Sequence, residues 1–362
     1  MIGGDLLATG SSSCVFRPNI PCKNSKDKVS NKKISKIVYG EKAVRYYDKE
    51  KKISRMLKSI KGHNKWSIVY DKFCEPPNYD NIFKYDKQLL SCKDKEYEHI
   101  FNGSSKMMVS KYGGITLEDY FIDTVLKDRS FKKMESAVFE LLKKMKQLFI
   151  GLNEIYKNKL IHLDIKYNNV VLDGIFFKYI DFGLSSELND LDHFKTRSLS
   201  EFNTKRIYLW YPPEYLYSSI ESYDKLSEYE KLTSGSKFRK HYRSLIEIHS
   251  LFDVRLNNYV KNLLKISSNP SDNVLKELVC KIDVYSLGIM IPFFFVEYDL
   301  VEYIEQSAFL KDLFRLCKDM CKLDYRERIT PDVCLKRYNQ LMRKYSYIQN
   351  TKGKKTLKKN KK

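Results

Sequence analysis

One segment near the middle of the chain holds the side chains that could carry out chemistry. HLDIKYNN (residues 162–169) is followed by a hairpin pattern and then by DFG (181–183). Asp164 can accept a proton from a hydroxyl group, while Asn169 and Asp181 offer the oxygen ligands that Mg²⁺ prefers. Each residue alone is typical of an ordinary polar loop. Together, at this spacing, they indicate a specific arrangement of one acid and two metal ligands.

Two elements must position these side chains. VVL (170–172) and IFFKYI (175–180) are joined by Asp173-Gly174, which predicts a β-hairpin that returns Asp181 to the side of Asp164. Upstream, a helix is predicted over 134–156, because its apolar positions alternate by four and three residues. This stripe comprises residues 134, 138, 141, 145, 148, 152 and 155.

The N-terminal part reads as strands around loops, with one helix. The helix is predicted over 41–60, and Glu50 falls on its apolar face. A charge on such a face costs free energy unless it is paired, so Glu50 is expected to have a partner. The strand candidates are 6–16, 33–39, 66–70 and 106–112.

The overall composition excludes several classes of protein. Hydrophobic residues make up 43% of the 362 residues and aromatic residues 14%, which excludes a disordered or fibrous chain. The formal net charge of +21 favours acidic partners. The last twelve residues hold seven lysines and no acid, so a solvated basic tail is expected, able to bind nucleic acid or an acidic surface. The longest apolar stretch, 287–296, is too short to span a membrane and predicts a buried core helix.

The cysteines and the first residues predict an intracellular protein. MIGGDLLATG lacks the basic flank and the apolar run of a signal peptide, so a reducing compartment with free thiols is expected. The expected location is the cytoplasm or nucleus, including that of a host cell, or a virion. Cys317 and Cys321 lie one helical turn apart; they are interpreted as buried core thiols, with a zinc site as the alternative.

The segment at 162–183 resembles the catalytic loop and metal-binding motif of eukaryotic-type protein kinases. The resemblance extends over about residues 5–345 and implies an α+β, bilobal fold. Residues 1–112 correspond to a small, mainly antiparallel β lobe with one key helix, and residues 113–345 to a larger, mainly helical lobe. The tail, 346–362, is expected to be disordered. The resemblance also implies ATP and Mg²⁺, bound between the lobes, and a protein substrate.

Four positions match the family's transfer chemistry. Asp164 matches the catalytic base, and Lys166 matches the lysine that neutralises the transferring phosphoryl group in serine/threonine kinases. Lys36 matches the strand lysine that binds the α- and β-phosphates. Glu50 matches the helix glutamate that pairs with this lysine, with Glu41 as the alternative.

The metal ligands and the glycine-rich loop follow from the same resemblance. Asn169 and Asp181 match the Mg²⁺ ligands, and residues 7–15 align with the glycine-rich loop, where one glycine of three is kept. The small residues in this loop let backbone amides approach phosphates. The nucleotide-binding positions implied here are Leu7, Ala8, Gly10, Ser13 and Val15.

The remaining matches are the adenine hinge and three structural positions. Residues 107–112 resemble the strand and hinge that hold adenine, and 211–214 resemble the end of the activation segment, whose Glu214 would pair with Arg328. Residues 283–288 resemble the helix that anchors the catalytic loop. His162 is interpreted as an architectural histidine rather than a base.

Two departures from the family pattern stand out. Leu163 replaces the arginine that normally binds an activating phosphate. Residues 215–282 form a long insertion, interpreted as a solvated helical elaboration. This insertion and the loosely matched PPE segment resemble kinases encoded by large DNA viruses.

Three functions stay open at this point. The first is an active serine/threonine protein kinase, in which Asp164 orients the attacking hydroxyl. The second is a pseudokinase scaffold, which the single loop glycine favours. The third is a small-molecule phosphotransferase of related fold, against which DFG and the PPE-like segment argue.

Overall fold

The structure of the chain is a computed structural model. It describes residues 5–10, 13–40, 43–77, 105–203, 208–212, 215, 243–252 and 271–349. The chain divides into two units, the first comprising Met1–Gly114 and Lys178–Gly183, and the second comprising Ile115–Phe177 and Leu184–Lys362.

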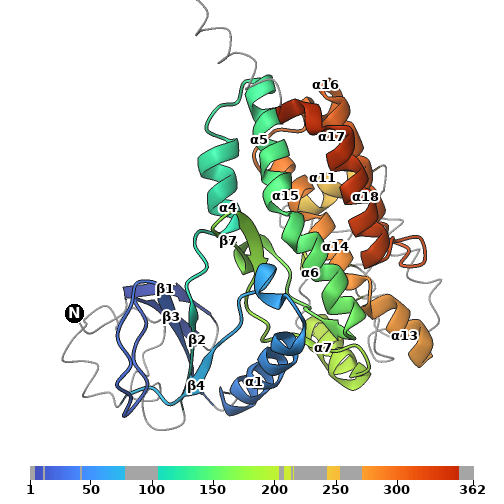
Figure 1. Cartoon of the computed structure of the whole chain (residues 1–362). Helices are drawn as coiled ribbons and strands as arrows, with labels where there is room; N and C mark the ends of the chain where they lie inside the picture. The colour runs from blue at the N-terminus through green and yellow to red at the C-terminus, as the bar shows by residue number, and fades with distance from the viewer. Residues whose placement is uncertain are drawn as a thin grey trace, which may run out of the picture. The chain divides into compact units, whose positions relative to one another are not determined.

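The first unit is built on a five-stranded antiparallel sheet (Figure 1). The strands lie in the order β1-β2-β3-β5-β4, so only β4 and β1 are edge strands. Their bounds are β1 (Asp5–Thr9), β2 (Ser13–Arg17), β3 (Lys33–Val38), β4 (Lys72–Cys74) and β5 (Lys106–Lys111). The strands predicted within 6–16, 33–39 and 106–112 are confirmed.

The strand predicted at 66–70 is wrong. Ser67 forms only an isolated bridge to Tyr179, and the edge strand begins at Lys72. Burial in 66–70 does not alternate, because Trp66, Ser67, Val69 and Tyr70 are all buried. A short apolar run that is packed on several sides gives the same sequence signal as a strand.

Helix α1 (Ala43–Ser59) confirms the helix predicted over 41–60 and packs on one face of the sheet. Val38 of β3 and Met108 of β5 share an apolar cluster with Tyr47 of α1. Ile37 of β3, one residue earlier, belongs to a second cluster on the opposite face. Because side chains alternate along a strand, Lys36 points to the same face as Val38.

The expectation that all cysteines are free thiols is wrong. Cys22 and Cys74 form a disulfide bond between the loop that follows β2 and the end of β4, and Cys14 is also disulfide-bonded. Cys22 and Cys74 are 52 residues apart, so only the folded sheet brings them together. Among the described cysteines, four are free, and all but the first are buried: Cys280, Cys317, Cys321 and Cys334.

The second unit is mainly helical (Figure 1). Its main helices are α4 (Leu117–Tyr120), α5 (Phe131–Lys144), α6 (Lys146–Lys157), α7 (Leu191–Asn203), α11 (Arg243–Leu251), α13 (Asp272–Val279), α14 (Ile282–Gly288), α15 (Met290–Glu297), α16 (Glu302–Gln306), α17 (Ala308–Met320) and α18 (Pro331–Lys344). Helices α5 and α6 together are the helix predicted over 134–156. Every residue of the predicted stripe is at most 2% exposed.

Helices α14 and α15 form the centre of this unit and confirm the predicted core helix. A Cβ atom on Gly288 would lie 2.5 Å from the Cβ of Met320, so only glycine lets α14 pack this closely against α17. The stretch Asp272–Glu297 is long and apolar enough to cross a membrane, but 89% of its most apolar window is buried inside the protein. Such burial is typical of the core helices of a folded domain.

Short strands frame the loops that carry the predicted chemistry. β6 (Leu160–Ile161) pairs with β9 (Ser186–Glu187), and β7 (Val170–Asp173) pairs with β8 (Phe176–Tyr179). The predicted hairpin is thereby confirmed. Its turn contains Gly174 at φ +69°, a conformation that favours glycine.

The described part of the predicted insertion is not a solvated elaboration. In α11, Leu245 and Ile248 are buried, and His249 Nε2 lies 3.2 Å from the hydroxyl of Tyr285 in α14. This helix is therefore part of the core. At the other end, a 3-10 helix at Ser346–Gln349 with a buried Ile348 continues past the predicted boundary at 345, and residues 350–362 lie outside the described residues.

Candidate active site

The strand register of the first unit brings three predicted nucleotide-binding residues into one row. Ala8 of β1 lies opposite Val15 of β2, and Val15 lies opposite Lys36 of β3. Residues directly opposite each other on paired strands point to the same face of the sheet. The row therefore lies on the face that α1 covers.

The turn between β1 and β2 is tight at Gly10. The Gly10 N–H donates to the backbone oxygen of Ser13 at 2.7 Å, and a Cβ atom on Gly10 would lie 2.8 Å from Ser13 Oγ. Leu7 is 48% exposed in an irregular part of β1. Residues 11–12 lie outside the described residues. A side chain at Gly10 would therefore require the Ser13 side chain to move.

Lys36 forms an ion pair with Asp181. Its Nζ donates to Asp181 Oδ1 at 2.9 Å, and the two side chains are 13% and 35% exposed. Burial alone would lower the pKa of Lys36, but the charge of Asp181, with smaller contributions from Tyr70 and Glu50, raises it above its usual value. The ion pair with Asp181 therefore favours the charged form of Lys36.

Glu50 is buried beside this pair, at 2% exposure. It accepts the backbone N–H of Phe182, but its Oε1 has no hydrogen-bond partner among the described residues. Burial and the like charge of Asp181 raise the pKa of Glu50. The predicted Lys36–Glu50 ion pair is thus replaced by Lys36–Asp181, because the more exposed carboxylate loses less hydration on pairing. Glu41, the alternative partner, lies outside the described residues.

In the second unit, two side chains of the same loop hold Asp164, which is 8% exposed. Lys166 Nζ lies 3.1 Å from both carboxylate oxygens. Asn169 Nδ2 donates to Asp164 Oδ2 at 2.7 Å and to its backbone oxygen at 2.9 Å. Although burial acts to lower it, the charge of Asp164 raises the pKa of Lys166. The structure therefore brings these three predicted residues together and fixes the orientation of the carboxylate.

A buried carboxylate from α14 fixes the backbone just before Asp164. Asp283 accepts the N–H groups of His162 at 2.6 Å and of Leu163 at 2.9 Å. Its burial raises the pKa of Asp283 to about 6 despite these hydrogen bonds. His162 is also buried, and its Nδ1 accepts the N–H of Asp164 at 3.3 Å. Both contacts agree with the anchoring helix and the architectural histidine expected from the sequence.

Leu163 in the second unit and Asp181 in the first adopt a backbone conformation that is rare outside glycine. Leu163 has φ +59° and Asp181 has φ +60°. Such residues cost roughly 1–3 kcal/mol each and persist only where the surroundings hold them. Leu163 is held by Asp283 and by Tyr211, whose hydroxyl donates to the Leu163 backbone oxygen at 2.8 Å. Strain of this kind clusters at active sites.

Comparison with known proteins decides the family. The chain matches the family model of the protein kinase domain over residues 6–229. The chain belongs to the protein kinase family. Over 73 residues it is 36% identical to CTD kinase subunit alpha of Saccharomyces cerevisiae, a match that covers 20% of this chain and 12% of the yeast protein. The five-stranded sheet and the helical second unit are those of the bilobal protein kinase fold.

In this kinase, Leu163 packs where the family resemblance places a phosphate-binding arginine. Its side chain is fully buried in an apolar cluster with Leu191 and Phe194 of α7, and with Tyr211 and Tyr215. The last two rings are stacked with their centroids 4.2 Å apart. Apolar burial therefore holds the described part of the activation segment on the catalytic loop of the kinase.

Sequence reasoning missed two features of the kinase site. Tyr208 hydrogen-bonds to Lys166, and the ammonium lies 5.9 Å from the centre of its ring. Helix α7 forms within the activation segment, where no helix was expected. Leu191 and Phe194, three residues apart, are a weak helical signal for it. The Tyr208 contact has no sequence signal, because it depends on the path of the whole segment.

One predicted contact of the kinase lies outside the described residues. Glu214, the expected partner of Arg328, is not among them. Arg328 itself is 1% exposed, and it donates to the backbone oxygen of Lys322 at 2.7 Å and to that of Lys281 at 3.4 Å. Its guanidinium thus ties the loop after α17 to the start of α14.

Proposed function

We propose that this kinase transfers the γ-phosphoryl group of ATP to serine and threonine hydroxyls of protein substrates, with Mg²⁺. The observation that carries this proposal is the buried carboxylate of Asp164, which Lys166 and Asn169 hold from the same loop. A lysine two residues after the aspartate is the arrangement of serine/threonine kinases. The proposed reactive positions are Lys36, Glu50, Asp164, Lys166, Asn169 and Asp181.

The donor atoms present fit ATP and Mg²⁺. Mg²⁺ prefers oxygen ligands, which Asp181 and the amide oxygen of Asn169 supply, since the amide nitrogen of Asn169 is used by Asp164. The cation of Lys36 and the backbone amides near Gly10 suit phosphate groups. When bound, Mg²⁺ stabilises the negative charge of the phosphates. Leu7, Ala8, Ser13 and Val15 are proposed as the other nucleotide contacts.

Some of these residues would orient the reacting groups, and others would stabilise negative charge. Asp164 orients the attacking hydroxyl and accepts its proton, a role that contributes roughly 10²- to 10⁴-fold in rate. Asn169 prevents its carboxylate from rotating away. Lys166 places a positive charge 3.1 Å from Asp164, where it stabilises the transferring phosphoryl group. Asp283 keeps the loop backbone in place.

Two observations favour the alternative of a pseudokinase scaffold. Lys36 is paired with Asp181 rather than with Glu50, and the glycine-rich loop keeps only Gly10. A protein of this kind would bind nucleotide or partners without turnover. A small-molecule phosphotransferase is the less favoured alternative.

The test is incubation of the purified protein with labelled ATP, Mg²⁺ and generic basic and acidic proteins, followed by phosphoamino acid analysis. Label on serine and threonine is the expected result. Label on tyrosine alone would contradict the proposed specificity. ATP binding without any incorporation would indicate the pseudokinase, and label confined to small hydroxyl compounds would indicate the third alternative.

Activity is expected not to depend on phosphorylation of the activation segment. Leu163 is buried among aromatic rings and cannot pair with a phosphate, so a phosphate would find no partner at this position. Phosphatase-treated protein should keep most of its rate in a peptide assay, compared with a mock-treated sample. A large loss that rephosphorylation restores would contradict this and implicate another cation, such as Arg206.

A further inference from the structure

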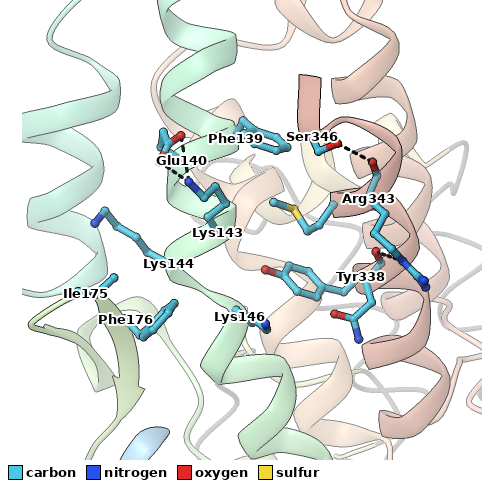
Figure 2. Close-up of a pocket in the computed structure, with 12 residues that line it drawn as sticks. Phe139, Glu140, Lys143, Lys144, Lys146, Ile175, Phe176, Tyr338, Arg343 and Ser346 are labelled. Carbon is cyan, nitrogen blue, oxygen red and sulfur yellow. Dashed lines mark hydrogen bonds and ion pairs between the residues drawn. The ribbon is translucent and has the colours of Figure 1, made fainter. Parts of the chain in front are cut away.

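A pocket of about 830 Å³ opens in the second unit, formed by α5, α6, the turn between β7 and β8, and α18 (Figure 2). Among the described residues that line it, none is assigned above to ATP, Mg²⁺ or the transfer of the phosphoryl group. The pocket therefore has no role in the proposed reaction itself.

The floor of the pocket is apolar. Phe139 of α5 and Tyr338 of α18 are each 2% exposed, and Figure 2 shows both rings between the two helices. The Tyr338 hydroxyl donates to the Leu142 backbone oxygen at 2.9 Å, so the ring offers the pocket its apolar surface. At the rim, Ile175 is 69% exposed at the tip of the hairpin. Its side chain extends the apolar surface of the pocket to the rim.

The rim of the pocket is basic. Among its described lining residues, four cations stand against one carboxylate: Lys143, Lys144, Lys146, Arg343 and Glu140. Glu140 is paired with Lys143 at 3.1 Å. Lys146 and Arg343 are exposed on opposite sides of the floor and have no ion pair within the described part of the chain. An apolar floor between two such cations suits an apolar side chain that is flanked by acids.

We propose that this pocket docks an acidic peptide segment carrying one or two large apolar side chains, presented by a protein substrate. Charge complementarity selects this occupant, and the net charge of +21 attracts acidic partners from a distance. The C-terminal residues 351–362, which begin five residues after Ser346 in the sequence, carry seven lysines and no acid, so their charge opposes docking here. The closed apolar floor also fits side chains better than a nucleic-acid backbone.

The hairpin links the pocket to the catalytic loop. Asn169 directly precedes β7, and Ile175 follows its turn, six residues later. At about 3.3 Å per strand residue, the two positions are at most about 20 Å apart. A linker of about six extended residues can span this distance, so one substrate chain can reach both places. The role of the pocket in substrate docking rests on the proposed function, but peptide binding to the pocket does not.

Binding is measured first, by fluorescence anisotropy of a labelled peptide with two leucines flanked by glutamates, added to the full-length protein. The double variant Lys146→Glu, Arg343→Glu is expected to weaken binding about tenfold or more, because it replaces two attractions by repulsions. The single variant Ile175→Ser is expected to weaken it severalfold. The three positions, Lys146, Arg343 and Ile175, are all exposed, so folding is preserved.

The matched control is Lys132→Glu, which makes the same change of two charges as each of the single variants Lys146→Glu and Arg343→Glu, on an exposed residue of α5. It lies eleven residues before Lys143, about 16 Å along the helix, and does not line the pocket. This variant should bind the peptide almost as tightly as the wild type. Equal losses in this control and in the single variants Lys146→Glu and Arg343→Glu would show only a general charge effect and overturn the proposal. Competition by duplex DNA or inorganic phosphate at equal charge concentration would overturn it as well.

Kinetics then test the link to substrates. A phosphoacceptor peptide fused to the acidic segment through about ten residues should show a KM several times lower than the acceptor peptide alone. The double variant should abolish this advantage and leave kcat, and the KM of the acceptor alone, unchanged. If the double variant kept the KM advantage of the fused peptide, substrate docking in this pocket would be refuted. Peptide binding without phosphorylation of any substrate would refute the proposed function and leave the pocket assignment standing.

Discussion

The Asp164→Asn variant is expected to lose phosphoryl transfer by on the order of 10²- to 10⁴-fold, while its affinity for ATP stays within about twofold of the wild type. The amide has the shape of the carboxylate, and its single oxygen, placed at the Oδ2 position, can still accept from both Lys166 and Asn169, so the loop keeps its geometry. It cannot accept the proton of the attacking hydroxyl. Initial rates with a peptide substrate and nucleotide titration measure the two effects separately.

A matched control for this variant is Asp123→Asn. Asp123 is an exposed carboxylate of the same unit, away from the catalytic loop in sequence, so the same chemical change should leave both rate and affinity unaltered. If Asp164→Asn kept near-full activity, the assignment of Asp164 as base would be wrong. A melting temperature lowered in Asp164→Asn but not in Asp123→Asn would indicate that the substitution had disturbed the catalytic loop.

The Asp181→Asn variant is expected to show the opposite pattern, with a loss of productive Mg²⁺–ATP binding. The neutral amide is a poorer Mg²⁺ ligand, and the ion pair with Lys36 at 2.9 Å is lost. Losing a charged contact to the bound Mg²⁺ costs roughly 1.5–3 kcal/mol of binding free energy, which corresponds to about 10- to 150-fold in affinity. The ATP affinity of the variant is measured by titration in excess Mg²⁺ and again in the presence of a chelator. The affinity difference between the two conditions, which the wild type should show, should be nearly absent in the variant.

Glu50 provides an internal check on this variant. The like charge of Asp181 contributes to the raised pKa of Glu50, so removing that charge should lower it. Lys36 then has one carboxylate left beside it. Asp181→Asn should therefore stay folded, with a melting temperature close to that of the wild type. Mg²⁺-dependent affinity equal to the wild type would contradict the assignment of Asp181 as a metal ligand.

Local patterns allowed much of the fold to be predicted. The stripe over 134–156 predicted a helix whose stripe residues are all buried, and Asp173-Gly174 predicted the hairpin that separates Asn169 from Asp181. Both signals arise from neighbours in sequence. The strand predicted at 66–70 is wrong because it also relied on a local signal. A short apolar run does not distinguish a strand from a coil that is packed on several sides.

The contacts of the candidate site are also of two kinds, those within one loop and those between distant segments. The sequence by itself determined which residue types are present, and it placed Asp164, Lys166 and Asn169 together because they share one loop of eight residues. Their mutual contacts need only the local backbone. Membership of the protein kinase family follows from the same short motifs, which the family match over residues 6–229 supports.

Only the tertiary structure decided the contacts between distant segments. Lys36 pairs with Asp181, 145 residues away, instead of Glu50, because burial penalises the ionised Glu50 more strongly. The disulfide between Cys22 and Cys74 and the basic pocket between α5 and α18 have the same origin. The hydration, charge and packing at these three places depend on every segment that packs there. The local sequence does not determine which distant segments those are.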